Sequence, residues 1–348
     1  MTQDRIAHDP ALADRSEPSV PAAALGQAWR PGRLVNRETG KNLLLLGFFG
    51  LVYLWFATQS SLFATFSNAE NILSASSVLG IVALGQMMTI VSGGFDLSVG
   101  GTVPLGSVLY AELLNSGLNA GEALILVVLC GTAIGVINGV IISRFNINPL
   151  ATTLATMSAA GGLALAVAGG VSIPFNRPIG VLTDQSAFGI SNSVWIFLAA
   201  CIVIFVVLRH TVFGRSLYAI GGNKEAARLA GLRIYLVETS VYVVSGALAA
   251  LAGAILASQV LTGSGTEGAD IALNSVAAAI VGGVSLKGGQ GGVPGTLLGI
   301  LILGTLANGM EVLSIQAFYQ TIATGVILLA AVALSQLHWQ TIWKLVRK

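Results

Sequence analysis

The stretch Tyr218-Ala-Ile-Gly-Gly-Asn-Lys-Glu-Ala-Ala-Arg-Leu-Ala-Gly-Leu232 places a polar, helix-prone segment between long apolar runs. Asn223 is positioned to cap a short helix at its N-terminus, and Gly231 at its C-terminus. Glu225 and Arg228 are three residues apart, so their charges would pair on one face of that helix. Such a segment can dock on a partner protein, or it can be an ordinary solvated loop helix. The basic residues in and around it are Arg209, Arg215, Lys224, Arg228 and Arg233.

The composition indicates a membrane protein. Of 348 residues, 54% are hydrophobic and 9% are charged, whereas about a quarter of the residues in an ordinary soluble domain are charged. Backbone groups in lipid must hydrogen-bond internally, which favours helices. The chain has 43 glycines, which would weaken soluble helices but let membrane helices approach closely.

Apolar segments follow one another after residue 40, most of them near the ~20 residues that a membrane-spanning helix needs. Two pairs are separated only by Ser92–Asp96 and Ser285–Pro294, so each pair could be two spans, a broken helix or a re-entrant hairpin. We therefore expect an all-α, polytopic transmembrane bundle of about ten spans. The ten segments are Asn42–Ala57, Asn71–Val91, Leu97–Leu114, Glu122–Ser143, Pro149–Gly169, Ser193–Leu208, Leu236–Leu261, Ile271–Val284, Gly295–Leu313 and Phe318–Leu337.

Three parts of the chain differ in composition. Residues 1–40 are polar and rich in Pro, Ala, Arg and Asp, and we expect a disordered cytoplasmic tail. Residues 41–337 form the predicted transmembrane domain, whose cytoplasmic loop at 209–235 contains the polar segment. Residues 338–348 are expected to form a cytoplasmic C-terminal tail.

The distribution of Lys and Arg predicts the orientation of the chain. If the N-terminus is cytoplasmic and ten spans alternate, all of the 17 Lys and Arg residues except Arg177 fall on the cytoplasmic side. Acidic residues such as Glu70, Glu122 and Asp184 fall on the outer side. Nine or eleven spans would destroy this sorting, so we expect both termini and the polar segment to be cytoplasmic.

The sequence shows neither catalytic residues nor an energy source of its own. It has no phosphate-binding Gly-x-x-x-x-Gly-Lys-Ser/Thr motif, and we expect no metal site and no catalytic residue. His8, His210 and His338 lie outside the spans, and Cys130 and Cys201 lie in apolar runs. Ionisable residues are nearly absent from the spans. Proton- or sodium-coupled carriers usually have one there, so the sequence gives no sign of ion coupling. The energy would therefore come from a partner, or the protein is a passive channel.

Glycines at every fourth position predict close helix packing inside the bundle. Gly131, Gly135 and Gly139 show this spacing in the fourth segment, and Gly295 and Gly299 show it in the ninth. Small residues at this spacing let two backbones come into contact.

Five polar residues in or near the spans are candidates for the solute pathway. Their amides and hydroxyls suit a hydroxylated solute, but an amide in lipid also bonds across helices, and Ser and Thr bond back to their own helix. Between these alternatives we favour interhelical bonding for both asparagines. The candidates are Gln86, Ser92, Asn138, Thr153 and Asn308.

Two glycine-rich turns resemble each other, which favours an internal repeat of the kind found in transporters. They are Ile90-Val-Ser-Gly-Gly-Phe-Asp-Leu-Ser-Val-Gly-Gly101 and Ile280-Val-Gly-Gly-Val-Ser-Leu-Lys-Gly-Gly-Gln-Gly-Gly292. Asp96 is expected to cap the helix that starts near Leu97. The residues assigned to these turns are Gly93, Gly94, Asp96, Gly282, Gly283, Gly288 and Gly289.

Several motifs together resemble the ribose-type (monosaccharide) permeases of bacterial ATP-binding cassette (ABC) importers, the inner-membrane components of binding-protein-dependent transport systems. The motifs occur in the family's order from about Asn42 to Leu337, and Phe95 stands where an aliphatic residue is commoner. They are Gly93-Gly-Phe-Asp-Leu-Ser-Val-Gly100, Gly135-Val-Ile-Asn-Gly139, Phe213-Gly-Arg215, Tyr218 to Gly231, Gly282-Gly-Val-Ser-Leu-Lys-Gly-Gly-Gln-Gly291, Gly295-Thr-Leu-Leu-Gly299 and Asn308-Gly309.

The resemblance implies a type II-like importer permease in the bacterial inner membrane, which imports a monosaccharide or related polyol. It implies ABC ATPase subunits inside that bind ATP and Mg, a periplasmic or lipid-anchored sugar-binding protein outside, and a second permease copy, identical or paralogous. This chain would bind no cofactor and no nucleic acid. An ion-coupled secondary transporter or a passive channel for small polar solutes is the alternative.

The polar segment would then be the coupling helix, which contacts the ATPase. The residues expected to form this contact are Gly222, Asn223, Lys224, Glu225, Ala226, Ala227, Arg228, Leu229 and Gly231.

Overall fold

A computed structural model describes residues 31–175, 181–184 and 187–336. The predicted C-terminal tail at 338–348 and residues 1–30 of the predicted N-terminal tail lie outside the described residues. The chain divides into two compact units, Met1–Lys41 and Asn42–Lys348. Helix α2 begins at Pro31, so residues 31–40, which we expected to belong to a disordered tail, are helical.

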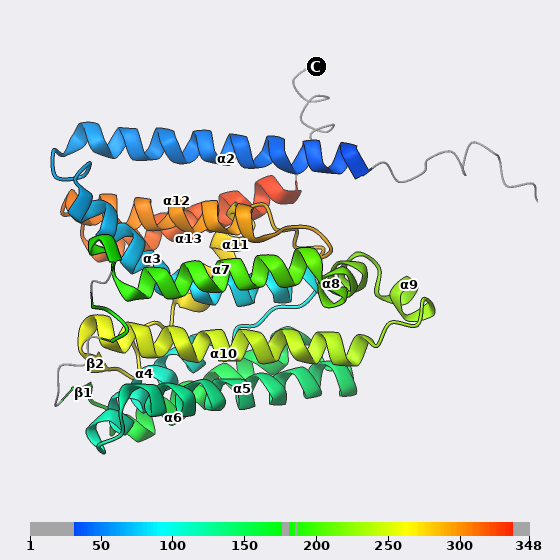
Figure 1. Cartoon of the computed structure of the whole chain (residues 1–348), viewed down its shortest axis with the longest axis horizontal. Coiled ribbons are helices and arrows are strands. Elements are labelled where there is room, and N and C mark those ends of the chain that lie inside the picture. The colour runs from blue at the N-terminus through cyan, green and yellow to red at the C-terminus, as the bar shows by residue number, and fades with distance from the viewer. Residues whose placement is uncertain (1–30, 176–180, 185–186, 337–348) are drawn as a thin grey trace, which may run out of the picture. The chain divides into compact units, whose positions relative to one another are not determined.

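The described chain is almost wholly helical (Figure 1). In this part of the chain, ten helices coincide with the ten apolar segments predicted from the sequence. They are α2 (Pro31–Gln59), α3 (Phe66–Val91), α4 (Val99–Asn115), α5 (Ala120–Phe145), α6 (Pro149–Ala168), α7 (Asn192–His210), α10 (Ile234–Val260), α11 (Ile271–Val281), α12 (Val293–Val312) and α13 (Ala317–Gln336).

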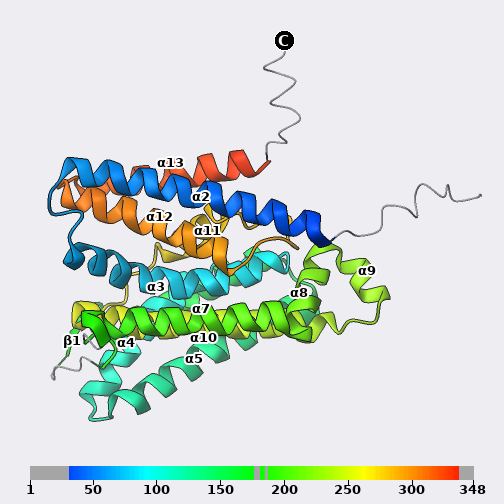
Figure 2. The ribbon, with the colours of Figure 1, turned by 45° about the horizontal axis from the view of Figure 1, so that its top comes forward.

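Short elements connect these helices. Helices α8 (Val212–Gly222) and α9 (Lys224–Leu229) lie between α7 and α10, and the 3₁₀ helix η2 (Ala187–Gly189) precedes α7. Strands β1 (Ile173–Pro174) and β2 (Thr262–Gly263) pair antiparallel. Figures 1 and 2 place α8 and α9 at one end of the helical bundle and the two strands at the other.

Seven helices among the described residues are long and apolar enough to cross a membrane: α2, α3, α5, α6, α7, α10 and α12. Helix α4 has 17 residues and α11 has 11, fewer than the ~20 of a complete span. Each is the shorter member of one of the two closely spaced pairs. The glycine-rich turns therefore separate a long helix from a short one, and neither pair is a single continuous helix.

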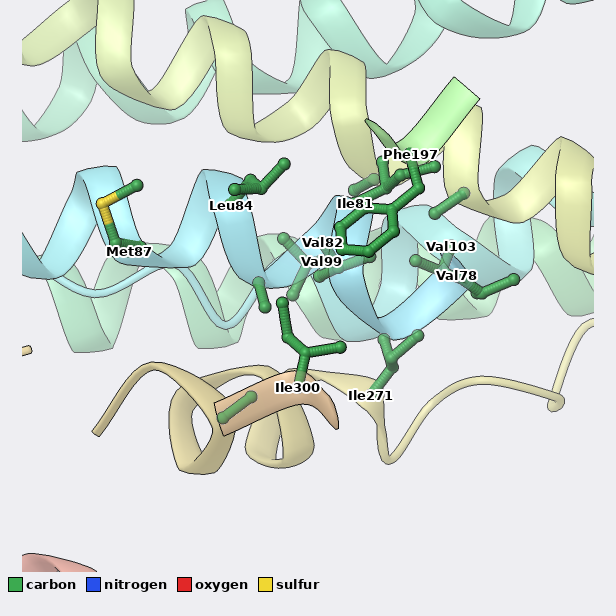
Figure 3. Packing of buried hydrophobic residues seen from close by; sticks show 14 of the residues in the cluster. Val78, Ile81, Val82, Leu84, Met87, Val99, Val103, Phe197, Ile271 and Ile300 are labelled. Atoms are coloured by element: carbon green, nitrogen blue, oxygen red, sulfur yellow. The ribbon is translucent and has the colours of Figure 1, made fainter. Parts of the chain in front are cut away.

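Helices α3 and α10 form the centre of the second unit. Helix α10 packs against α3, α4 and α5, and α3 also packs against α7, α11 and α12. The core around them is apolar (Figure 3), as expected where side chains exclude both water and lipid. Its central residues include Val78, Ile81, Val82, Leu84, Met87, Val99, Val103, Phe197, Ile271 and Ile300.

The prediction that the spaced glycines pack inside the bundle is confirmed. A Cβ atom on Gly135 would collide with the backbone of Tyr242 in α10, and one on Gly246 would collide with the carbonyl oxygen of Gly131. Gly295 and Gly299 of α12 are pressed in the same way against the C-terminal end of α11. Only glycine allows the backbones to come this close.

Candidate functional site

Helix α9 forms where the sequence predicts it, because a side-chain cap starts it. Asn223 has extended backbone angles (φ −160°, ψ 100°), and its Oδ1 accepts a hydrogen bond from the Ala226 backbone N at 2.9 Å. This satisfies one of the free N–H groups of the first turn. The predicted N-cap is thus confirmed, and it separates α9 from the end of α8.

The other end of α9 closes at a glycine. Ala230 occupies the cap position, and Gly231 follows it with φ +80°, a left-handed conformation that favours glycine. The predicted Glu225–Arg228 pair is present at 2.7 Å, and both side chains are largely exposed. Ala227 is the buried residue of the helix, whereas Leu229 is 79% exposed.

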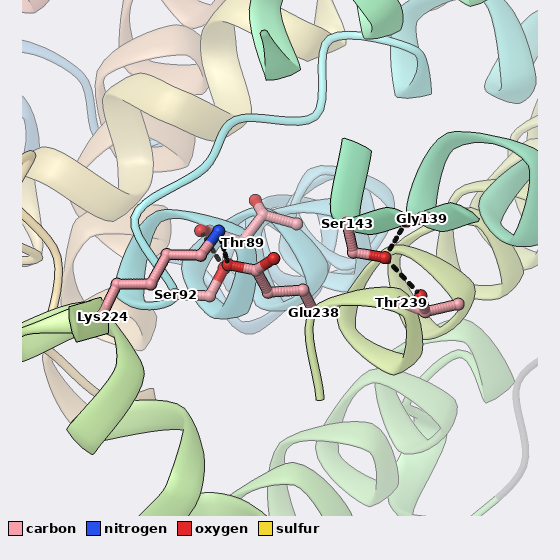
Figure 4. Close-up of polar contacts among 7 residues, drawn as sticks. All are labelled: Thr89, Ser92, Gly139, Ser143, Lys224, Glu238 and Thr239. Carbon is pink, nitrogen blue, oxygen red and sulfur yellow. Dashed lines mark hydrogen bonds and ion pairs between the residues drawn. The ribbon is translucent and has the colours of Figure 1, made fainter. Parts of the chain in front are cut away.

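A second ion pair, which the sequence did not predict, connects α9 to the bundle. The Lys224 Nζ lies 2.7 Å from Glu238 Oε1 in the second turn of α10 (Figure 4). The Glu238 side chain is 8% exposed and the Lys224 side chain 51% exposed. The two residues are separated by the rest of α9 and a turn, so no helical spacing rule points to the pair.

The two glycine-rich turns, predicted as similar, lie against each other in space. The Gly289 N–H donates a hydrogen bond of 2.8 Å to the carbonyl oxygen of Val91, the last residue of α3. A Cβ atom on Gly221, near the end of α8, would collide with both Val91 O and Gly289 N. Backbone therefore packs directly on backbone where α8 meets both turns.

The turn residues themselves adopt the backbone that glycine permits. Four of them have φ between +71° and +92°: Gly93, Gly283, Gly288 and Gly289. Gly94 lacks room for a side chain, because a Cβ atom there would collide with the Tyr242 hydroxyl. Gly282 caps the C-terminus of α11 and is pressed against Gly295, the close contact described above.

Asp96 does not cap a helix at Leu97 as expected. Helix α4 begins at Val99 with Ser98 in the cap position. The buried Asp96 carboxylate instead accepts hydrogen bonds through Oδ1 from the Ser98 backbone N, at 3.0 Å, and from the Ser98 hydroxyl. This is a local Asx turn, a geometry that short polar side chains favour over a helical start.

Ser98 also belongs to a chain of hydrogen bonds that links α4, α5 and α6. The Asn138 Nδ2 of α5 donates to Ser98 Oγ at 2.8 Å, and the Thr156 Oγ1 of α6 donates to Asn138 Oδ1 at 2.6 Å. Asn308 Oδ1 of α12 likewise accepts from Asn68 Nδ2 of α3 at 2.9 Å. Interhelical bonding, the alternative that we favoured for Asn138 and Asn308, is confirmed.

Within the described residues, the remaining pathway candidates, Gln86, Ser92 and Thr153, make no hydrogen bond to another helix. The hydroxyls of Ser92 and Thr153 bond to carbonyl oxygens of their own helices, at Thr89 and Pro149. Gln86 is buried in α3, and neither of its amide atoms has a hydrogen-bond partner. None of these hydrogen bonds joins two of the five candidates, and their place in a pathway stays a prediction.

A cavity of about 340 Å³ lies where α8, α9 and the first glycine-rich turn meet. The end of α3, the α5–α6 loop and the start of α10 also line this cavity. Its walls include Ser92, Gly93, Gly94, the loop Asn146 to Pro149, Gly221 to Lys224, Glu238 and Tyr242. Among the described residues, no group of three or more His, Cys, Asp or Glu side chains could hold a metal ion.

These features define a polytopic helical membrane protein with a charged two-helix loop at one end. Residues 68–332 match the family model described as the permease component of a branched-chain amino acid transport system. The match covers most of the chain, and the chain belongs to this family of transport permeases. It is a multi-pass inner-membrane transport subunit and not an enzyme.

Curated relatives cover the chain more widely. It is 37% identical to the ribose import permease protein RbsC of Bacillus subtilis (strain 168), over 77% of this chain and 84% of the relative. It is 39% identical to the L-arabinose transport system permease protein AraH of Escherichia coli (strain K12), over 78% and 83%. The L-arabinose ABC transporter permease protein AraH of Azospirillum brasilense is 34% identical over 91% of both chains. No solved structure matches the chain significantly.

Proposed function

We propose that this chain is the permease subunit of an ABC importer and forms the transmembrane pathway for a monosaccharide or related polyol. The observation that carries the proposal is identity of 34 to 39% with ribose and L-arabinose permeases over at least 77% of the chain. The family model's own description names branched-chain amino acids. These relatives favour a sugar, and an uptake assay that offers both solute classes separates the two.

Helix α9 is the part of the chain that docks on an ABC ATPase. It presents an exposed apolar side chain, Leu229, beside the exposed Glu225–Arg228 pair, and a desolvated apolar residue within a polar rim is the usual composition of a binding hot spot. ATP and Mg would bind to that ATPase and not to this chain. The proposed contact extends over Gly222 to Leu229 and Gly231.

A solute-binding protein delivers the sugar on the opposite side, and a second permease copy, identical or paralogous, completes the pathway. Ten spans with both termini inside the cell give the arrangement that the Lys and Arg distribution favours. The ten helices that coincide with the apolar segments support this count, with α4 and α11 as short helices beside the glycine-rich turns.

The mechanism is alternating access driven by the ATPase. Closure of the ATPase dimer displaces α9, and the backbone contacts of Gly221 with Val91 and Gly289 pass that displacement to α3 and to the turn before α12. Rigid backbone contacts suit this purpose, because packed elements shift as bodies and do not deform continuously.

Co-purification tests the docking assignment. The permease is purified through a tag with its neighbouring ATPase, and residues 225–228 are replaced by Gly and Ser. We expect loss of the ATPase from the purified complex, with normal membrane insertion. A variant that retains the ATPase and transports normally would show that α9 is only a solvated loop helix.

A further inference from the structure

The Lys224–Glu238 ion pair connects an exposed helix to a buried one. Lys224 is the first residue of α9, and Glu238 lies in α10, close to the cavity wall formed by Ser92 and Tyr242. Figure 4 shows the lysine side chain reaching across this space to the carboxylate. The Nζ–Oε1 distance of 2.7 Å is that of a direct, charge-assisted hydrogen bond.

The charge of each side chain is unfavourable at its position unless the other side chain is present. A cation at the N-terminus of a helix is repelled by the helix dipole, which favours acidic side chains there. A carboxylate that is 8% exposed costs free energy unless it is paired. Glu238 Oε2 has no hydrogen-bond partner, and among the described residues Lys224 is the side chain that forms an ion pair with this carboxylate.

The pair also joins a loosely packed helix, α9, to a tightly packed one, α10. Helix α9 buries only Ala227, so little apolar packing fixes its position. Helix α10, in contrast, packs against α3, α4 and α5 through the centre of the unit. A short turn, from Ala230 to Arg233, is the covalent connection between them.

We propose that the Lys224–Glu238 ion pair locks α9 to α10, so that the two helices move as one body when a motor subunit displaces α9. The proposal rests on the proposed docking of an ATPase at α9 and makes Lys224 and Glu238 positioning residues for energy coupling. Without the pair, α9 would follow the ATPase while α10 stays in place. ATP would then be hydrolysed without a matching movement of the spans.

Hydrogen exchange of the purified permease tests the lock without any partner. The probes are the backbone amides of Ala227 and Ala230, which close the hydrogen bonds of α9. In Lys224→Glu these amides should exchange about fivefold faster, the effect of losing a partly exposed ion pair. Glutamate suits a helix N-terminus better than lysine does, so faster exchange would report the lost pair and not a weaker helix.

Charge reversal of both partners provides the rescue. The double variant Lys224→Glu/Glu238→Lys should restore slow exchange. Glu238→Gln, which removes the charge but keeps the shape, should also exchange faster than the wild type. Arg215→Glu is the matched control, because Arg215 is an exposed cation of the same loop. Unchanged exchange in Lys224→Glu, or a double variant no slower than the single one, would overturn the lock.

Transport per ATP hydrolysed then tests the coupling role in proteoliposomes with the ATPase and the binding protein. We expect this ratio to fall about fivefold in Glu238→Gln, a change at a buried residue outside the proposed docking contact, with the ATPase still bound. An unchanged ratio despite faster exchange would overturn the coupling role alone. Failure of the wild-type permease to bind the ATPase would overturn the proposed function, while the exchange result would still stand.

Discussion

At the scale of single residues, two adjacent glycines differ in how closely other atoms surround them. A Cβ atom on Gly221 would collide with backbone atoms of Val91 and Gly289, whereas one on Gly222 would meet nothing within 4 Å. Both glycines lie at the end of α8, so they share the same local helical environment. Alanine at each of the two positions therefore separates the effect of close packing from the effect of adding a methyl group.

Gly221→Ala should therefore destabilise the permease, and Gly222→Ala should not. We expect a loss of about 1–3 kcal/mol for Gly221→Ala, because backbone atoms cannot give way cheaply, and a change near zero for Gly222→Ala. Thermal unfolding of the two variants in detergent measures the difference. Equal unfolding temperatures would show that α8 does not press on the two turns.

The cap of α9 is a second residue-scale feature with a clear test. Asn223→Ala removes the acceptor of the Ala226 N–H and should cost about 1 kcal/mol of local helix stability, whereas Asn223→Ser keeps a capping oxygen. We expect faster exchange of the α9 amides and weaker ATPase retention in Asn223→Ala only. If alanine and serine behave alike, the cap does not matter for docking.

At the scale of secondary-structure elements, the contact between α5 and α10 depends on missing side chains. Gly246 of α10 faces Gly131 of α5, and its substitution would place a methyl group against a carbonyl oxygen. Gly162 of α6 provides the matched control, since a Cβ atom there meets nothing within 4 Å.

Gly246→Ala should lower the thermal stability of the detergent-solubilised protein by about 1–3 kcal/mol, the usual cost of overpacking. Gly162→Ala should leave it unchanged or raise it slightly, because alanine is the better helix former. The prediction fails if the two variants unfold at the same temperature.

The apolar pattern predicted the positions of the long helices because lipid and core both require continuous apolar runs. The cap at Asn223, the Glu225–Arg228 pair and the packing of Gly135 also followed from local spacing rules. Local rules misplaced the start of α4, because Asp96 bonds to Ser98 in a turn. They missed the Lys224–Glu238 pair entirely, since contacts between elements depend on how a turn directs two helices.

At the scale of the whole molecule, the proposed orientation places α9 inside the cell and the α4–α5 loop outside. Cysteine labelling in a variant without Cys130 and Cys201 can test this. Leu229 and Ser116 are both exposed, so both positions would react in water. In right-side-out vesicles, a membrane-impermeant maleimide should label Ser116→Cys and not Leu229→Cys until detergent is added. Labelling of Leu229→Cys from outside would invert the orientation.

The proposed function requires that a separate ATPase drives import of a monosaccharide through this permease. The most direct measurement is uptake into proteoliposomes that contain the permease, its ATPase and its binding protein, with labelled ribose, L-arabinose or leucine offered in turn. We predict ATP-dependent accumulation of a sugar and none of leucine, and no uptake when the ATPase is left out. Accumulation of sugar driven by an ion gradient without the ATPase would show that the permease is an ion-coupled secondary transporter.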